Sequence, residues 1–371
     1  MTNLECDVLI VGGGVIGLAC ARQLASTGVE VVLVERADDF GTITSSRHSE
    51  VIHAGIYYTP GSLKARSCVE GRRLLYDYLD AKHIPYQKIS KLIFACSKEE
   101  LRDLELLYQR GLENEVEGLS LLGQTELKRL ESELDAYGAI HSAETGIFDS
   151  HLYLKSLEQD ARDYGASLAL KTSFKSARKD GDDWTVCLCT SENESIKVRS
   201  RWLINTAGHR AHAVAKQIAE YPKRHLPRRY LAKGTYWSTS QNLPFKRLLY
   251  PMPNAAGLGI HLTFDLNGAA RFGPDVTWVD EERYEVDASQ KEHFIQAIQS
   301  YFPGLDPERL HPDYAGIRPK LVGPGEPAHD FVIQGPGDHS CMGLMHCFGV
   351  ESPGLTASLA LARMIERLTA F

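Results

Sequence analysis

The sequence predicts an α/β protein, α+β overall, in which a Rossmann-like dinucleotide-binding domain is discontinuous and a domain with an antiparallel sheet is inserted into it. Three observations predict this class. A glycine-rich βαβ pattern opens the chain, segments of similar strand-and-helix character close it, and short strands separated by Pro and Gly fill residues 222–287. The length of 371 residues suits two domains.

The opening pattern is a complete nucleotide-binding unit. Residues 7–11 form an apolar run of strand length, residues 12–17 fit G-x-G-x-x-G, and residues 18–27 carry apolar side chains at helical spacing. A second apolar strand, residues 29–34, ends at Glu35. This order of strand, glycine turn, helix, strand and acidic residue is typical of dinucleotide binding.

In such a unit the glycines let the backbone approach a pyrophosphate at the N-terminus of a helix, and the acidic residue accepts hydrogen bonds from a ribose. A carboxylate at this position also disfavours a 2′-phosphate. A glycine-rich turn alone occurs in many α/β proteins, but the flanking strands and helix make that reading improbable here. The predicted contacts of this unit are Gly12, Gly14, Val15, Ile16, Gly17, Glu35 and Arg36.

The rest of the chain supplies elements for both predicted domains. Helices are expected at 62–83, 98–111, 151–164 and 353–368, and strands at 91–96, 184–188, 196–198, 202–208, 331–334 and 342–348. We predict a nucleotide-binding domain of residues 1–84, 146–215 and 308–371, and a substrate domain of residues 85–145 and 216–307. Since no second G-x-G-x-x-G occurs, we expect a single dinucleotide, which favours FAD.

Composition narrows the classes of partner. The net charge of −7, with acids and bases interspersed, argues against a nucleic-acid partner. No apolar run approaches the roughly 20 residues of a membrane helix, and no signal peptide is recognisable. We therefore expect a cytoplasmic location, with peripheral contact to the inner membrane left open. The eight cysteines show no C-x-x-C or Cys/His metal spacing, so we expect reduced thiols and no metal site.

The segment SSRHSEVIHAGIYY, residues 45–58, gathers polar side chains directly behind the nucleotide-binding unit. We expect it to hold the flavin, with Ser46, Arg47 and Ser49 near the phosphates or the ring edge and His53 beside the isoalloxazine. The predicted cofactor contacts here and in the turn that ends the strand 202–208 are Ser45, Ser46, Arg47, Ser49, His53, Ala54, Gly55, Ala207 and Gly208.

Residues 258–265 alternate apolar and polar side chains, which predicts a strand with His261 and Thr263 on its polar face. That face meets either a flavin and its substrate or only water, and in the second case His261 is a surface residue.

Two further segments carry candidate anion-binding groups. Pro319 forces Arg318 toward an extended backbone, from which the guanidinium could bind a carboxylate, or could pair with an internal acid. Ser352 is expected to cap the last helix with Pro353 in its first turn, and free N–H groups there would stabilise a reduced flavin, unless this is an ordinary cap. The predicted contacts are Arg318, Gly349, Ser352, Pro353, Gly354, Leu355 and Thr356.

Taken together, several segments resemble the L-2-hydroxyglutarate dehydrogenase/oxidase family of the D-amino-acid oxidase-like FAD superfamily. They are residues 45–58, 205–208, 257–268, 316–321, 330–335 and 348–360. The resemblance implies a flavoenzyme with noncovalent FAD that oxidises L-2-hydroxyglutarate to 2-oxoglutarate and passes electrons to a quinone-type acceptor or O2. The chain departs from the family pattern at His48, at His209 and at residues 345–347.

Combined with the resemblance, the residues predict that a base takes the hydroxyl proton while the α-hydrogen leaves as hydride to flavin N5. His261 is the preferred base and His53 its competitor, while Arg318 would hold one substrate carboxylate and Lys320 or Lys233 the other. The predicted substrate-binding residues are Tyr57, Lys233, Tyr250, His261, Thr263, Arg318 and Lys320. The alternatives are an amine or amino-acid oxidase, a glycerol-3-phosphate dehydrogenase-like enzyme, and a non-catalytic flavin-binding protein.

Overall fold

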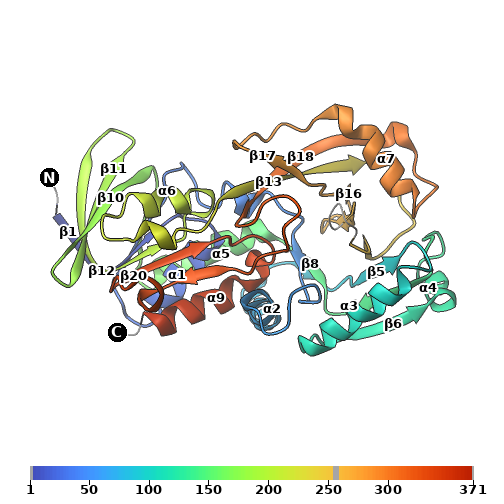
Figure 1. The fold of residues 1–371 in the computed structure, drawn as a ribbon, viewed down its shortest axis with the longest axis horizontal. Helices are drawn as coiled ribbons and strands as arrows, with labels where there is room; N and C mark the ends of the chain where they lie inside the picture. The colour runs from blue at the N-terminus through green and yellow to red at the C-terminus, as the bar shows by residue number, and fades with distance from the viewer. Residues whose placement is uncertain (1–2, 254–258, 370–371) are drawn as a thin grey trace. The chain divides into compact units, whose positions relative to one another are not determined.

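The computed structural model describes residues 3–253 and 259–369, which fall into two compact units (Figure 1). Unit 1 consists of Met1–Ser46, Ser150–Leu231 and Arg318–Phe371, and unit 2 of Arg47–Asp149 and Ala232–Ile317. These boundaries differ from the predicted ones because residues 47–84, 146–149 and 308–317 lie in unit 2 and residues 216–231 in unit 1. The reassigned segments pack with their new units: Val69 and Ile147, for example, share a core with Ile140.

Unit 1 is built on an eight-stranded mixed sheet. The main strand order is β10-β11-β12-β1-β2-β9, with β20 beside β12 and β19 beside β20. Strand β1 runs parallel to both β2 and β12, as the nucleotide-binding pattern requires. The bounds are β1 Asn3–Val11, β2 Val31–Val34, β9 Ser167–Ala169, β10 Thr172–Asp180, β11 Asp183–Thr190, β12 Ser195–Asn205, β19 Val332–Gln334 and β20 Leu344–Phe348. The two strands predicted at 196–198 and 202–208 are thus one continuous strand.

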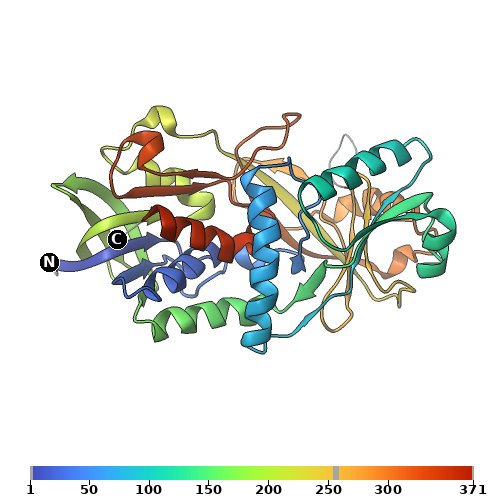
Figure 2. The ribbon, with the colours of Figure 1, turned by 90° about the horizontal axis from the view of Figure 1, so that it is seen from below.

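Three long helices of unit 1 lie side by side (Figure 2). Helix α1 (Val15–Ala25) contacts both α5 (Ser150–Asp163) and α9 (Gly354–Leu368). Tyr153 and Ser358 share a buried hydrogen bond of 2.8 Å between α5 and α9, and Arg22 pairs with Asp160 at 3.0 Å. The short helices are α6 (Ala211–Lys216) and α8 (Pro336–His339). The glycine turn before α1 is therefore anchored by helices from distant parts of the sequence.

Unit 2 contains a nine-stranded sheet of order β17-β13-β16-β15-β14-β5-β7-β6, with β18 beside β13. Its strands are β5 Lys91–Ala95, β6 Leu119–Gly123, β7 Gly138–Ser142, β13 Tyr230–Thr239, β14 Leu248–Pro251, β15 Leu262–Phe264, β16 Ala270–Phe272, β17 Thr277–Val279 and β18 Leu310–Lys320. The antiparallel sheet predicted for residues 222–287 is confirmed, because β14 pairs with β15, β15 with β16 and β16 with β13 in antiparallel fashion. Strand β5, from outside that region, joins the sheet by pairing in parallel with β14. Short apolar runs indicate strands but carry no information on the direction of a partner far along the chain.

The sheet of unit 2 has a helix-covered core on each face. Leu92 and Phe94 of β5 belong to the core that contains Phe294 of α7 (Lys291–Gln299). Ile93 lies in the other core, with Leu104 of α3 (Leu101–Glu113). The two-residue period of the strand therefore separates the two cores.

Unit 2 also contains a small sheet of three strands in the order β3-β8-β4. Helices α2 and α4 belong to unit 2 as well. The bounds are β3 Val51–Ile52, β8 Gly146–Phe148, β4 Tyr86–Gln87, α2 Leu63–Ala81 and α4 Gln124–Leu130.

The strand predicted at 258–265 is shorter, since β15 starts at Leu262 and Leu258 lies outside the described residues. All eight cysteines are free. In the described parts of the chain, no helix is both long and apolar enough to cross a membrane.

Candidate active site

The glycine-rich turn of unit 1 is packed backbone against backbone. Gly12 adopts φ +110°, and a Cβ there would lie 2.7 Å from Cα of Ala207. A Cβ on Gly17 would lie 1.9 Å from the carbonyl oxygen of Gly12. Only glycine fits at either position, so the turn keeps the backbone amides at the start of α1 unobstructed by side chains.

The flanking polar residues hold this turn in place. Glu35, which follows β2, accepts hydrogen bonds of 2.8 Å from the N–H groups of Gly13 and Ala37. Ser45 accepts one of 3.0 Å from the N–H of Val15, in the first turn of α1. Each carboxylate oxygen has a further lone pair, so Glu35 can hold the turn and still accept from a ribose hydroxyl.

The predicted turn after β12 meets the same end of the sheet. Thr206 donates from Oγ1 to the carbonyl of Gly12 at 2.9 Å, and His209 shares a 3.1 Å hydrogen bond with Thr44 through its Nε2. His209, one of the departures from the family pattern, thus ties this turn to the segment that leads to Ser45. Gly208, at φ +51°, has open space where a Cβ would be.

The loop before α9 differs from the expected cap. Pro353, rather than Ser352, occupies the N-cap position, and α9 begins at Gly354 without a side-chain cap. The helix begins one residue later than expected because the chain first makes a turn, in which the N–H of Gly354 donates to the carbonyl of Glu351. The side chain of Glu351 forms a 2.8 Å ion pair with Lys320. Lys320, which was predicted to bind a substrate carboxylate, therefore already has a partner within the protein.

These observations show that unit 1 fits the ADP portion of FAD. Its glycine cradle excludes side chains, the N-terminal turn of α1 carries no acidic residue, and a carboxylate follows β2. Positive helix ends of this kind stabilise phosphate. Of the other predicted contacts, Arg36 and Ser46 are exposed, and Ser46 donates to the carbonyl of Ile43.

In unit 2, the register of three neighbouring strands gathers a second group of functional side chains. Strands β14 and β15 are antiparallel with Leu249 opposite Leu262, and continuing this register by one residue brings Tyr250 opposite His261. Their rings stack at 3.6 Å between centroids with an interplanar angle of 14°. Strand β5 runs on the other side of β14 with Lys91 beside Leu248, diagonal to Tyr250. The ammonium of Lys91 lies 4.6 Å from the centre of the Tyr250 ring. We call Lys91, Tyr250 and His261 the sheet cluster.

The predicted loop residues His53 and Tyr57 approach this sheet cluster. Lys91 Nζ lies 5.1 Å from the centre of the Tyr57 ring. Burial, reinforced by the charge of Lys91, lowers the pKa of His53 to about 3, so its imidazole is neutral at physiological pH. Asn114 holds the loop by donating to the carbonyls of Gly55 (3.0 Å) and Tyr58 (2.8 Å). Sequence reasoning placed both residues near the reaction, and the structure puts both beside Lys91.

Lys91 is the residue that sequence reasoning missed. It opens a short apolar strand, and a lysine at a strand end is usually exposed. Here it is only 1% exposed and lies on the same face of β5 as buried Ile93. The sequence did contain one signal. Lys91 is two residues before Ile93 and four before Ala95, so in a strand all three side chains lie on the same face, and a charge falls at a core position.

Other predicted residues in unit 2 make contacts within the protein. Lys233 donates to the carbonyl of Glu285 at 2.9 Å, and Arg47 lies 4.3 Å above the ring of Tyr284. Thr263 is buried and donates weakly to the carbonyl of Arg271, at 3.4 Å. Arg318 is half-buried at the end of β18, where unit 1 resumes. None of these contacts singles out a second substrate cation.

The glycine cradle at the start of α1, with a carboxylate after β2, defines a protein that binds a dinucleotide cofactor. The family model of FAD dependent oxidoreductases matches residues 7–368, so the chain belongs to this family and FAD is its cofactor. Within this family, the chain is similar to L-2-hydroxyglutarate dehydrogenases, as its sequence motifs predicted.

The relative from Arabidopsis thaliana, a mitochondrial L-2-hydroxyglutarate dehydrogenase, is 39% identical over 97% of this chain and 82% of its own length. The human protein of the same name is 29% identical over 97% of this chain and 87% of its own. Among solved structures, L-alpha-glycerophosphate oxidase from Mycoplasma pneumoniae with FAD bound superposes with a TM-score of 0.87 at 27% identity, over 99% of this chain and 95% of that one. Glycine oxidase from Geobacillus kaustophilus, at 19% identity and TM-score 0.80, shares the fold, over 99% of this chain and 95% of its own.

The relatives overturn one prediction. The expected cytoplasmic location is wrong on this comparison, since the relatives from plant, slime mould, mouse and human are named mitochondrial proteins. The prediction failed because the lack of a recognisable leader does not establish the compartment of a protein.

Proposed function

We propose that this chain catalyses the FAD-dependent oxidation of L-2-hydroxyglutarate to 2-oxoglutarate. The observation that carries the proposal is the stacked pair of Tyr250 and His261 near His53. It offers the buried imidazole of His261 and the partly buried one of His53 to a secondary alcohol. The names of the relatives support the choice of substrate. FAD, when bound, supplies the hydride acceptor.

We propose His261 as the base that takes the hydroxyl proton. His261 is 4% exposed, and its ring is held in place by the stack on Tyr250. The competing base, His53, has its pKa lowered to about 3, chiefly by burial. A base is most effective when its pKa is near the working pH, so His53 would accept a proton poorly and is better suited to positioning the hydroxyl.

The proposed cofactor contacts are the residues of the glycine turn with Glu35 and Ser45, and noncovalent attachment is expected. Arg318 is our proposed partner for a substrate carboxylate.

Precipitation of the protein with acid, followed by fluorescence of the supernatant and the pellet, separates released from covalently held flavin. Flavin that remains in the pellet would contradict noncovalent binding.

The function is tested by mixing the purified yellow protein anaerobically with single substrates and following the loss of flavin absorbance. We expect L-2-hydroxyglutarate to bleach the flavin faster than its D-enantiomer, L-alpha-glycerophosphate or any amino acid. The glycerophosphate arm is included because of the structural similarity to an oxidase of that compound. Faster bleaching by glycerophosphate or an amino acid would favour those activities, and no bleaching by any of them would favour a non-catalytic flavoprotein.

The electron acceptor is proposed to be a quinone-type compound or O2. Reoxidation of the bleached enzyme by air, compared with a soluble quinone analogue, distinguishes the two. If the protein reaches a membrane quinone through peripheral contact with the membrane, it should sediment together with lipid vesicles.

A further inference from the structure

Lys91 is a buried cation without an anionic partner. It is 1% exposed, and its contacts are the faces of two tyrosine rings, Tyr57 and Tyr250. Among the described residues, its ammonium forms no ion pair with a carboxylate. The residues outside that description include no Asp or Glu. The hydroxyl of Tyr57 is likewise buried without a partner in the described structure.

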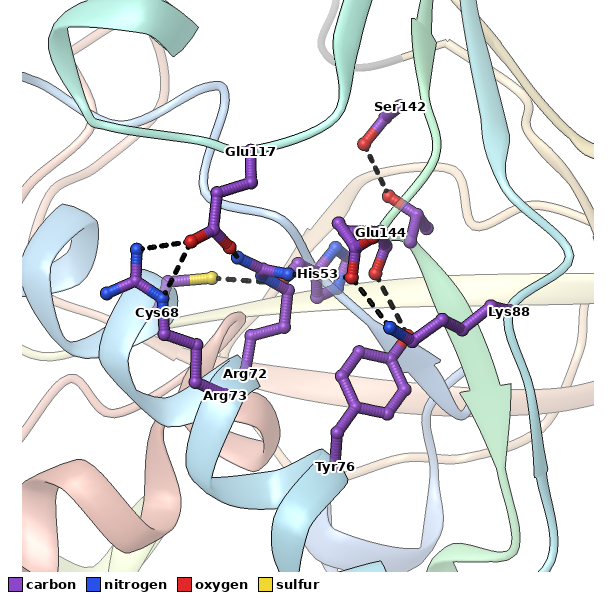
Figure 3. A network of polar contacts seen from close by, with 10 residues as sticks. His53, Cys68, Arg72, Arg73, Tyr76, Lys88, Glu117, Ser142 and Glu144 are labelled. Atoms are coloured by element: carbon purple, nitrogen blue, oxygen red, sulfur yellow. Dashed lines mark hydrogen bonds and ion pairs between the residues drawn. The ribbon is translucent and has the colours of Figure 1, made fainter.

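Three other cations of unit 2, Arg72, Arg73 and Lys88, are paired with carboxylates. Figure 3 shows Glu117 between Arg72 and Arg73, and Glu144 between Arg72 and Lys88. The Arg72–Glu144 distance is 3.1 Å and the Lys88–Glu144 distance is 2.8 Å. Arg72, as buried as Lys91, thus has two carboxylates. Lys91, by contrast with these three cations, has no carboxylate partner among the described residues.

An unpaired buried charge is costly, because the ammonium loses its hydration. The two aromatic faces recover only part of this loss. Burial lowers the pKa of Lys91 to about 8, so the ammonium is still mostly protonated at neutral pH. A group in this situation is prepared to bind an external anion.

We propose that Lys91, together with the hydroxyl of Tyr57, whose ring the ammonium faces, binds a carboxylate of the substrate. A carboxylate accepts charge-assisted hydrogen bonds from an ammonium and from a phenol. It would therefore give Lys91 an anionic partner and the Tyr57 hydroxyl a hydrogen-bond acceptor. This inference rests on the proposed function for the identity of the substrate, but the anion site itself follows from the sheet cluster. It also gives Tyr250 a role, since the ring packs on both Lys91 and the proposed base His261.

The test compares Lys91→Met with Lys88→Met in the FAD-loaded protein. Glutarate, which lacks the reacting hydroxyl, serves as a dicarboxylate that binds without turnover, and its Kd is read from perturbation of flavin absorbance. We expect Lys91→Met to weaken glutarate binding about 10- to 100-fold, the usual effect of losing a hydrogen bond to a charged group. Lys88→Met, which removes an exposed, paired lysine, should leave the Kd unchanged.

A second measurement separates binding from folding. Without ligand, Lys91→Met should be at least as stable to heat as the parent, because it removes an unpaired buried charge. Glutarate should raise the Tm of the parent but not that of Lys91→Met. An unchanged Kd for Lys91→Met, or a loss of stability without ligand, would overturn the proposal and make Lys91 a structural residue.

A third comparison identifies the carboxylate. If Lys91 binds the carboxylate far from the hydroxyl, Lys91→Met lowers kcat/KM for L-2-hydroxyglutarate but hardly changes it for L-2-hydroxybutyrate. Equal losses for both substrates place Lys91 at the carboxylate next to the hydroxyl. If the parent protein does not oxidise L-2-hydroxyglutarate at all, the proposed function fails, while the glutarate measurements still decide the role of Lys91.

Discussion

The glycine turn of unit 1 and the sheet cluster of unit 2 are assembled in opposite ways. The turn is a contiguous segment that works through its backbone, and Gly12 and Gly17 contribute by having no side chain. The sheet cluster takes one side chain from each of three segments, Lys91, Tyr250 and His261, which strand register brings together. The first site is therefore sensitive to added volume and the second to changed chemistry.

The largest expected effect concerns the chemistry of unit 2. His261→Ala should lower turnover about 10²- to 10⁴-fold, the usual contribution of a positioned base, without lowering the FAD content. His53→Ala should have a smaller effect on turnover. Stopped-flow flavin reduction measures the rate, and absorbance of the purified protein measures the FAD content.

A larger loss of flavin reduction in His53→Ala than in His261→Ala would exchange the two roles. A parallel loss of FAD and turnover in His261→Ala would make that residue structural. Either result would weaken the contrast between the glycine turn, which is sensitive to added side-chain volume, and the sheet cluster, which is sensitive to changed side-chain chemistry.

The next largest effect belongs to the glycine turn. In Gly12→Ala, the new Cβ would meet the backbone of Ala207 at 2.7 Å, and φ +110° is strained for any residue other than glycine. We expect FAD content to fall at least about tenfold, given the few kcal/mol that such strain and overlap cost. The matched control is Gly337→Ala, where a Cβ has open space. Retention of FAD by Gly12→Ala would show that the turn tolerates added volume.

These contrasts explain what could be predicted from the sequence. The glycine turn could be located from the sequence, because its glycines are nearly consecutive and each of their requirements is local. Its contacts with FAD stay a prediction. Tyr250 and His261 were predicted individually, but their stacking depends on the register of β14 and β15. Lys91 was missed because its spacing from Ile93 is only a weak local signal of burial, and the parallel pairing of β5 with β14 cannot be read from the sequence. The cap at Ser352 was misplaced by one residue, the ordinary uncertainty of a helix end.

A buried neutral histidine in each unit predicts acid sensitivity in both. His346 of β20 is fully buried, and its Nδ1 lies 2.9 Å from Nδ2 of Asn205. Burial, followed by the charges of His339 and Lys223, lowers the pKa of His346 to about 3, as burial does for His53. The folded state therefore binds a proton more weakly than the unfolded state, whose histidine pKa is about 6.5. Stability is full above pH 6.5 and falls as the pH decreases toward 3, by about 1.4 kcal/mol per pH unit for His346.

Chemical denaturation between pH 7 and pH 4 tests this for each unit. His346→Phe, which cannot be protonated, should lose less stability on acidification than the parent protein. His53→Gln should reduce the acid sensitivity in the same direction. The exposed His151 of α5 provides the control, since His151→Gln should leave the pH dependence unchanged. An identical pH dependence in parent and His346→Phe would show that His346 is not the titrating group.

The smallest expected effect compares one hydroxyl in each unit. Thr44→Val removes the 3.1 Å hydrogen bond to His209, and Ser142→Ala removes the 2.9 Å hydrogen bond to Thr145. Each should cost about 1 kcal/mol of unfolding free energy, the usual net value of one hydrogen bond. Only Thr44→Val should also weaken FAD binding, because Thr44 positions the segment from which Ser45 reaches the first turn of α1. Titration of the apoprotein with FAD measures this directly, and equal FAD affinity in both variants would mean that the turn is held by its glycines alone.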